Sequence, residues 1–104
     1  MTRPASDLDG FRLWPGLLDR AAQEALRDDV FALMRAGPLY VPRMPKSGQP
    51  MRVRMTNFGA LGWVTDKEQG YRYQDTHPDT GKPWPEMPAR VLALWRELSG
   101  YSAN

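Results

Sequence analysis

Cysteine is absent from the 104-residue sequence, and histidine occurs once, at His77. Without thiols the chain can form neither a disulfide framework nor a thiolate metal site. A single histidine and no nucleophile elbow leave no catalytic triad. The sequence also lacks a glycine-rich phosphate-binding motif. Residue types alone therefore identify no catalytic centre in this chain.

Long hydrophobic runs are also missing. No stretch approaches the roughly 20 apolar residues that a membrane-spanning helix requires, and residues 1–6 lack the apolar segment of a secretion signal. The length is that of one domain or part of one. We expect a soluble, cytoplasmic, monomeric protein with no membrane partner.

Acidic residues are absent from residues 36–65, which contain four basic residues: Arg43, Lys46, Arg52 and Arg54. The excess positive charge of the chain, +2 at pH 7, therefore lies in this central segment. A basic patch with interleaved aromatic residues suits a phosphate backbone. Solvated loops and strand faces carry similar charges, and charge alone favours that simpler interpretation.

Residues 50–74 are the most strongly patterned part of the sequence. Apolar and polar side chains alternate over residues 51–56, which indicates an extended strand. Two further runs rich in β-branched and aromatic residues, 61–65 and 71–74, follow after breaks that contain glycine. We predict three short strands joined by tight turns.

Two helices are predicted, one on each side of this region. The first spans residues 20–36, with Asp19 as its N-cap and Gly37-Pro38 as its stop. The second spans about residues 88–99 and ends at Gly100. Residues 10–14 form a short strand in this prediction, and residues 1–9 form a flexible terminus. The fold class is α+β, with two helices packed on a small antiparallel sheet.

Two further motifs are better explained structurally. His77-Pro78-Asp79 matches the H-x-D pattern of non-haem iron sites, but that site needs a second histidine and Pro78 favours a turn. Residues 42–45 and 85–88 both match P-x-x-P, a ligand pattern for SH3-type grooves. This pattern is common in proline-rich connectors, which is the interpretation we favour.

An ordered series of motifs runs through the second half of the chain. In sequence order it comprises M-R-V-R-M-T-N (51–57), L-G-W (61–63), Q-G-Y-R-Y (69–73), H-P (77–78) and G-K-P-W-P (81–85). This series resembles the N-terminal half of the AlkB-type nucleic-acid demethylases, which are Fe(II)- and 2-oxoglutarate-dependent dioxygenases. The resemblance extends from about Gly10 to Tyr101.

The resemblance implies that residues 10–104 are the N-terminal part of an AlkB-like domain, with a nucleotide-recognition lid at about 45–74. Trp63 would stack on a flipped, alkylated base, and Met51 and Met55 would line its pocket. Tyr71 would reach a backbone phosphate. Three basic residues would add electrostatic attraction to the backbone: Lys46, Arg52 and Arg54.

The sequence also departs from the family pattern. The jelly-roll core, the iron ligands and the 2-oxoglutarate-binding arginine of the family have no counterpart in this chain, so we expect it to bind neither cofactor and to be inactive alone. One extra residue separates Trp63 from Tyr71, and Pro45, Gln49 and Pro50 replace residues that often carry hydroxyl groups.

We therefore interpret the chain as a fragment of a DNA repair dioxygenase. Its partners would be single-stranded or alkylated DNA, or RNA, and the missing catalytic half. Two alternatives remain open at this point: a stand-alone module that binds single-stranded nucleic acid without reacting, and a non-functional remnant.

Overall fold

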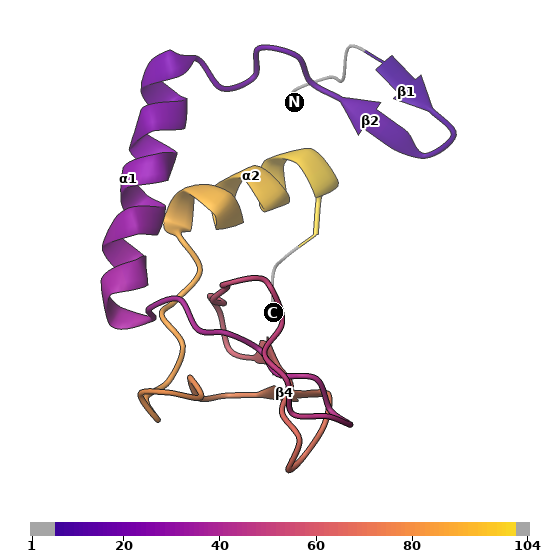
Figure 1. Cartoon of the computed structure of the whole chain (residues 1–104). Coiled ribbons are helices and arrows are strands. Elements are labelled where there is room, and N and C mark those ends of the chain that lie inside the picture. The colour runs from indigo at the N-terminus through magenta and orange to yellow at the C-terminus, as the bar shows by residue number, and fades with distance from the viewer. Residues whose placement is uncertain (1–5, 102–104) are drawn as a thin grey trace. The chain divides into compact units, whose positions relative to one another are not determined.

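The computed structural model describes residues 6–101, which form two helices and four short strands (Figure 1). The elements in chain order are β1 (Ser6–Leu8), β2 (Phe11–Leu13), α1 (Arg20–Ala36), β3 (Gly62–Val64), β4 (Arg72–Gln74) and α2 (Ala89–Ser99). The strands form two separate antiparallel pairs, β1–β2 and β3–β4, and residues 6–101 close no barrel. The predicted α+β class is confirmed. Neither described helix is long and apolar enough to cross a membrane.

The chain divides into two compact units. The terminal unit comprises Met1–Asp29 together with Pro88–Asn104, and the central unit comprises Val30–Met87. Helix α1 runs from the first unit into the second, whereas each antiparallel strand pair lies within one unit.

The terminal unit begins with a hairpin. The turn between β1 and β2 consists of Asp9 and Gly10, which have positive φ angles of 51° and 90°. Two left-handed residues of this type make the turn that matches the twist of a tight hairpin. The structure thus differs from the predicted flexible terminus at Ser6–Leu8, because the Asp-Gly turn pairs these residues with β2. The rest of that predicted segment, residues 1–5, lies outside the described residues.

Both helices lie where the sequence predicts them. The Asp19 carboxylate accepts a hydrogen bond from the Ala22 backbone N–H at 2.8 Å, which caps the start of α1. Helix α2 begins at Ala89 after Pro88 and ends at Gly100, whose φ of 76° is left-handed. Within the terminal unit, Arg90 of α2 donates to the Asp29 carboxylate of α1 at 2.7 Å.

The central unit is built around a small aromatic core. Tyr40, Val64 and Trp84 are buried and pack together. His77 is 1% exposed, and its ring centroid lies 5.2 Å from those of Tyr40 and Trp84. Three rings in edge-on and tilted contact fill more space than aliphatic side chains could, which suits a unit with so few buried residues.

Trp84 also joins the core to the β3–β4 pair. A Cβ atom at Gly62 would come within 2.3–2.6 Å of three indole atoms of Trp84, so only glycine allows this contact. The Trp84 indole N–H donates to the Gln74 carbonyl of β4 at 2.7 Å. Since Gly62 is paired with Gln74, a single side chain covers one strand and is hydrogen-bonded to the other.

The predicted first strand, residues 51–56, is not a strand in the structure, and this prediction is wrong. Only isolated bridges form there, Arg43 with Pro50 and Tyr40 with Met55. Between these bridges, four residues (51–54) face two (41–42), so the ladder cannot stay in register. Pro42 and Pro50 also lack the N–H groups that a ladder needs.

Replacement of Gly62 tests the contact with Trp84. We expect Gly62→Ala to lower the free energy of unfolding by about 3 kcal/mol, because the indole is buried and cannot withdraw from the added methyl group. Urea denaturation followed by circular dichroism measures the change. The neighbouring Leu61→Ala is the control, because Leu61 is exposed and its replacement should cost less than about 1 kcal/mol. Equal stability of Gly62→Ala and the parent chain would contradict the close contact.

Candidate functional site

Three aromatic side chains share the outer face of the β3–β4 pair. Trp63 is directly opposite Tyr73, so both side chains point to one face, and Tyr71, two residues earlier, points the same way. Gly62 and Val64 point to the opposite, buried face. We call Trp63, Tyr71 and Tyr73 the aromatic face.

The members of the aromatic face are accessible. Tyr71 and Tyr73 are 60% and 71% exposed, and Trp63 is half-buried. The rings of Trp63 and Tyr71 are stacked, with centroids 5.8 Å apart and planes inclined by 28°. The structure therefore brings together two residues that the sequence predicts to bind substrate. Tyr73 is not among those predicted residues, although the Tyr-Arg-Tyr alternation places it on the same strand face as Tyr71.

The backbone of Trp63 is fixed from beneath. The buried Tyr40 hydroxyl donates a hydrogen bond to the Trp63 carbonyl. The Asn57 side-chain amide donates both to this hydroxyl, at 2.8 Å, and to the same carbonyl, at 3.2 Å. Burial raises the pKa of Tyr40 above its ordinary value, the negative charge of Asp79 raises it further, and the Asn57 hydrogen bond opposes them. The hydroxyl therefore stays protonated at neutral pH and remains a donor.

A tight turn precedes Tyr71 and is organised by Arg72. The Arg72 guanidinium contacts the Asp66 carboxylate at 2.7 Å and the Gly70 carbonyl at 3.1 Å, and it also donates to the Gln74 side chain at 2.8 Å. The Asp66 carboxylate also accepts from the Gln69 N–H at 2.8 Å. These bonds close residues 66–70 into one turn and fix the point where Tyr71 leaves it.

The same contacts change the acidity of Asp66. The hydrogen bond from Arg72 is the largest effect and, together with the backbone N–H groups of the turn, it holds the pKa of Asp66 below its ordinary value of 3.8. The two side chains are only 22% and 27% exposed, so water screens the pair incompletely.

Both predicted methionines are half-buried. Met55 is partly buried and packs against the Tyr40–Val64–Trp84 cluster, which lies on the buried side of β3. Met51 is half-buried, and its N–H donates to the Pro42 carbonyl at 2.8 Å. The structure thus places Met55 among the core side chains and not with Trp63 on the aromatic face.

The predicted basic residues are all exposed: Lys46, Arg52 and Arg54. Lys46 lies at the tip of a loop closed by the Met44 N–H, which donates to the Gln49 carbonyl at 2.8 Å. Gly48 of this loop lies against the Lys67 side chain, whose Cδ would be 3.2 Å from an added Cβ. The basic loop therefore contacts the turn that leads to Tyr71.

His77 does not fit an iron site. Its Nδ1 accepts from the backbone N–H groups of Asp79 and Thr80, at 3.0 and 3.3 Å, so Nε2 carries the proton and donates to the Pro38 carbonyl at 2.6 Å. Both ring nitrogens are thus engaged, and the ring is buried. No group of three acidic or histidine side chains within residues 6–101 could hold a metal ion. His77 acts as a structural cross-link in the central unit.

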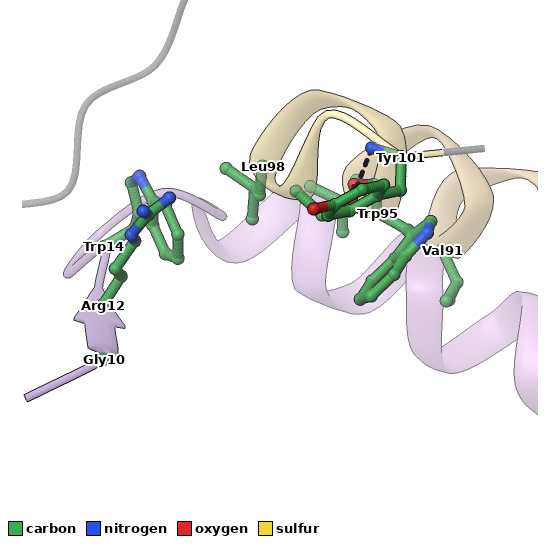
Figure 2. Close-up of a pocket in the computed structure, with 9 residues that line it drawn as sticks. Gly10, Arg12, Trp14, Val91, Trp95, Leu98 and Tyr101 are labelled. Atoms are coloured by element: carbon green, nitrogen blue, oxygen red, sulfur yellow. Dashed lines mark hydrogen bonds between the residues drawn. The ribbon is translucent and has the colours of Figure 1, made fainter. Parts of the chain in front are cut away.

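The terminal unit contains an open apolar hollow of about 570 Å³ (Figure 2). It is lined mainly by apolar side chains: Trp14, Val91, Leu94, Trp95 and Leu98. Among the described residues that line it, Arg12 is the only charged one. Such a lining suits packing against apolar groups and offers no acid–base pair.

Comparison with known proteins identifies similar sequences. Residues 10–103 match the family model of the 2OG-Fe(II) oxygenase superfamily. A Caulobacter vibrioides protein named alpha-ketoglutarate-dependent dioxygenase AlkB homolog is 47% identical over 98 residues, which cover 94% of this chain and 44% of that protein.

Two further proteins named alpha-ketoglutarate-dependent dioxygenase AlkB are similar as well. The Salmonella typhimurium protein is 40% identical over 87 residues, or 81% of this chain and 39% of its own length. The Escherichia coli protein is 43% identical over 70 residues, or 65% of this chain and 30% of its own length. The chain thus spans less than half the length of these relatives.

The Asp66–Arg72 pair predicts a dependence of stability on pH. Because the folded state lowers the pKa of Asp66, protonation favours the unfolded state, and the pair's contribution disappears as the pH falls from about 4 through the folded-state pKa. We expect Asp66→Asn to cost about 1 kcal/mol at about pH 6, since the pair is partly screened. Urea unfolding from about pH 6 to about pH 2.5 should show the parent chain and the variant converging in acid.

Glu68→Gln is the matched control, because it removes a carboxylate from the same turn that makes no ion pair within residues 6–101. It should leave the pH profile close to that of the parent chain. A constant difference between Asp66→Asn and the parent chain across this pH range would contradict the assignment.

Proposed function

The chain belongs to the 2OG-Fe(II) oxygenase superfamily, and we propose that it forms the nucleotide-recognition part of an AlkB-like enzyme. Its substrate is single-stranded or alkylated nucleic acid, and its role is to hold one extruded base on Trp63. The oxidation of an N-alkyl group on that base, and its loss as an aldehyde, belongs to the whole enzyme.

The stacked pair on the aromatic face carries this proposal. The Trp63 and Tyr71 rings lie 5.8 Å apart on an accessible strand face. An indole offers two faces, and Tyr71 lies over one of them, so the base takes the other. Removing a base from its stack costs a few kcal/mol, and stacking on one aromatic platform returns about 1–3 kcal/mol. The Tyr71 side chain is 60% exposed, and in this proposal its hydroxyl donates to a backbone phosphate of the bound strand.

Charge in the central unit supports the same substrate. Val30–Met87 contains eight basic and five acidic residues. Three exposed basic side chains of this unit form no ion pair within residues 6–101: Lys46, Arg52 and Arg54. Unpaired surface cations attract a phosphate backbone without reading its sequence. In this proposal they hold the strand while the aromatic face holds the base.

Met51 and Met55 have a supporting role in this proposal. Methionine is flexible and polarisable, and Met55 packs against the core beneath β3. In this proposal Met55 supports β3 from beneath, and the half-buried Met51 lines the pocket of the base, where its flexibility suits differently alkylated bases. In this proposal Fe(II) and 2-oxoglutarate are cofactors of the whole enzyme.

Replacement of Trp63 tests base stacking. We expect Trp63→Leu to weaken binding of a fluorescently labelled single strand of six deoxynucleotides about 10-fold or more, because a stacking platform is removed. Anisotropy titration of the 104-residue chain measures the dissociation constant. Trp95→Leu, at a half-exposed tryptophan of the terminal unit, should change it less than twofold. Equal affinities of both variants and the parent chain would remove the stacking role.

Replacement of Arg52 and Arg54 tests the electrostatic role. The double variant Arg52→Gln/Arg54→Gln should bind the same strand more weakly, and the slope of log affinity against log salt should become shallower by about 0.7 for each phosphate that is no longer neutralised. Titrations between about 50 and about 300 mM NaCl give this slope. Arg20→Gln, at an exposed residue of the terminal unit, is the control. An unchanged slope in the double variant would rule out phosphate binding by these arginines.

A further inference from the structure

His77 is a buried titratable residue to which the proposed function gives no role. Its side chain is 1% exposed. Its Nε2 donates to the Pro38 carbonyl at 2.6 Å, and its Nδ1 accepts from the backbone N–H groups of Asp79 and Thr80. It is the only histidine in the sequence, and histidine is the type of side chain that ordinarily gains a proton as the pH falls from 8 to 5.

Protonation would remove the acceptor that this arrangement requires. A neutral imidazole has one donor nitrogen and one acceptor nitrogen, whereas an imidazolium has two donors. The proton on Nδ1 of a charged ring would meet the N–H groups of Asp79 and Thr80, whose nitrogens lie 3.0 and 3.3 Å away. Three donors would then face one another without an acceptor, and a positive charge would be buried. The hydrogen bonds therefore suit only the neutral ring.

The two aromatic rings that contact His77 also hold the β3–β4 pair. Tyr40 donates to the Trp63 carbonyl of β3, and Trp84 donates to the Gln74 carbonyl of β4 at 2.7 Å. Both ring centroids lie 5.2 Å from that of His77. A change at His77 therefore reaches both strands through one side chain each.

We propose that His77 is a pH-sensitive latch of the central unit. In its neutral form the ring joins its own turn, which is closed by the Gly81 N–H donating to the His77 carbonyl at 2.9 Å, to Pro38. Uptake of a proton breaks this joint, so the core beneath β3–β4 opens at mildly acidic pH. The latch concerns the fold of the central unit and is independent of nucleotide binding.

The charged groups around His77 do not replace the lost acceptor. Three of them flank it in the sequence with exposed side chains, namely Asp75, Asp79 and Lys82. Tyr40 packs against the ring from the other segment, and burial raises its pKa, so it carries no charge at this pH. The negative charge of Asp79 favours an imidazolium, but water screens exposed charges. A ring face also attracts a cation, yet neither effect supplies an acceptor at Nδ1.

The direction of the effect follows from proton linkage. A folded state that excludes a proton bound by the unfolded state loses stability in acid, so the contribution of His77 is present above about pH 6.5 and is lost below it. The limit for one proton is a rise of about 10-fold in the unfolding equilibrium constant for each pH unit. Carboxylates ordinarily titrate near about pH 4, so the effect of the Asp66–Arg72 pair lies in a lower pH range.

Urea unfolding of the untagged 104-residue chain at several pH values tests the latch. Between about pH 6.5 and about pH 5, the unfolding equilibrium constant of the parent chain should rise about 10-fold or more. His77→Asn cannot gain a proton, but its side-chain oxygen can accept from the N–H two residues on, as Nδ1 does. Its unfolding constant should change less than about twofold over the same range.

Asp79→Asn is the matched control. It removes an acidic charge beside His77 and keeps the backbone N–H that donates to Nδ1, so it should retain the pH dependence of the parent chain. A parent constant that changes less than about twofold between about pH 6.5 and about pH 5 would overturn the latch. Equal pH dependence in the parent chain and His77→Asn would also overturn it, because another group would then take up the proton.

Proton NMR of the parent chain gives an answer even if His77→Asn does not fold. The one histidine yields one set of ring C–H signals for the folded state. At about pH 5.5 these signals should keep the position of a neutral ring, while those of the unfolded state grow. A folded-state signal that moves to the position of a protonated ring, with no growth of the unfolded state, would rule out the latch.

Discussion

The contact between Trp84 and Gly62 is the constraint on which the central unit depends. The indole can lie against β3 only because position 62 carries no side chain, and its N–H holds β4 through the Gln74 carbonyl. A two-stranded sheet is marginal by itself. With one face covered by this ring and by its contacts to Tyr40 and His77, the opposite face need not be buried. The aromatic face is open to solvent for that reason.

Local signals in the sequence determined much of the fold. The bounds of α1 follow from an N-cap at Asp19 and the Gly37-Pro38 stop, and both act over a few residues. The prediction for residues 51–56 failed because their structure depends on distant residues: a register mismatch with residues 40–43 breaks the ladder, and no pattern within 51–56 shows it. Strand β1 was not predicted, although Asp9-Gly10 is a local hairpin signal.

The candidate site was predictable in part. Trp63 and Tyr71 could be singled out by their place in an ordered motif series, and the structure brings their rings together. Their roles toward a nucleotide remain predictions. Met55 shows the limit of a pattern: alternation grouped it with Met51 and Val53, but it could not show that Met55 packs against the buried cluster while Val53 stays exposed. The position of Tyr73 opposite Trp63 could not be predicted without the strand register, because it follows from the pairing of β3 with β4.

The hydrogen bonds to the Trp63 carbonyl have a consequence for the evolution of such a protein. Tyr40 and Asn57 hold the main chain at this position, so the fold there depends little on which side chain is attached. Exchanges at the three positions of the aromatic face can accumulate with small effects on stability, while exchanges beneath it cannot. The chemistry of this exposed face is therefore free to diverge while the architecture stays the same.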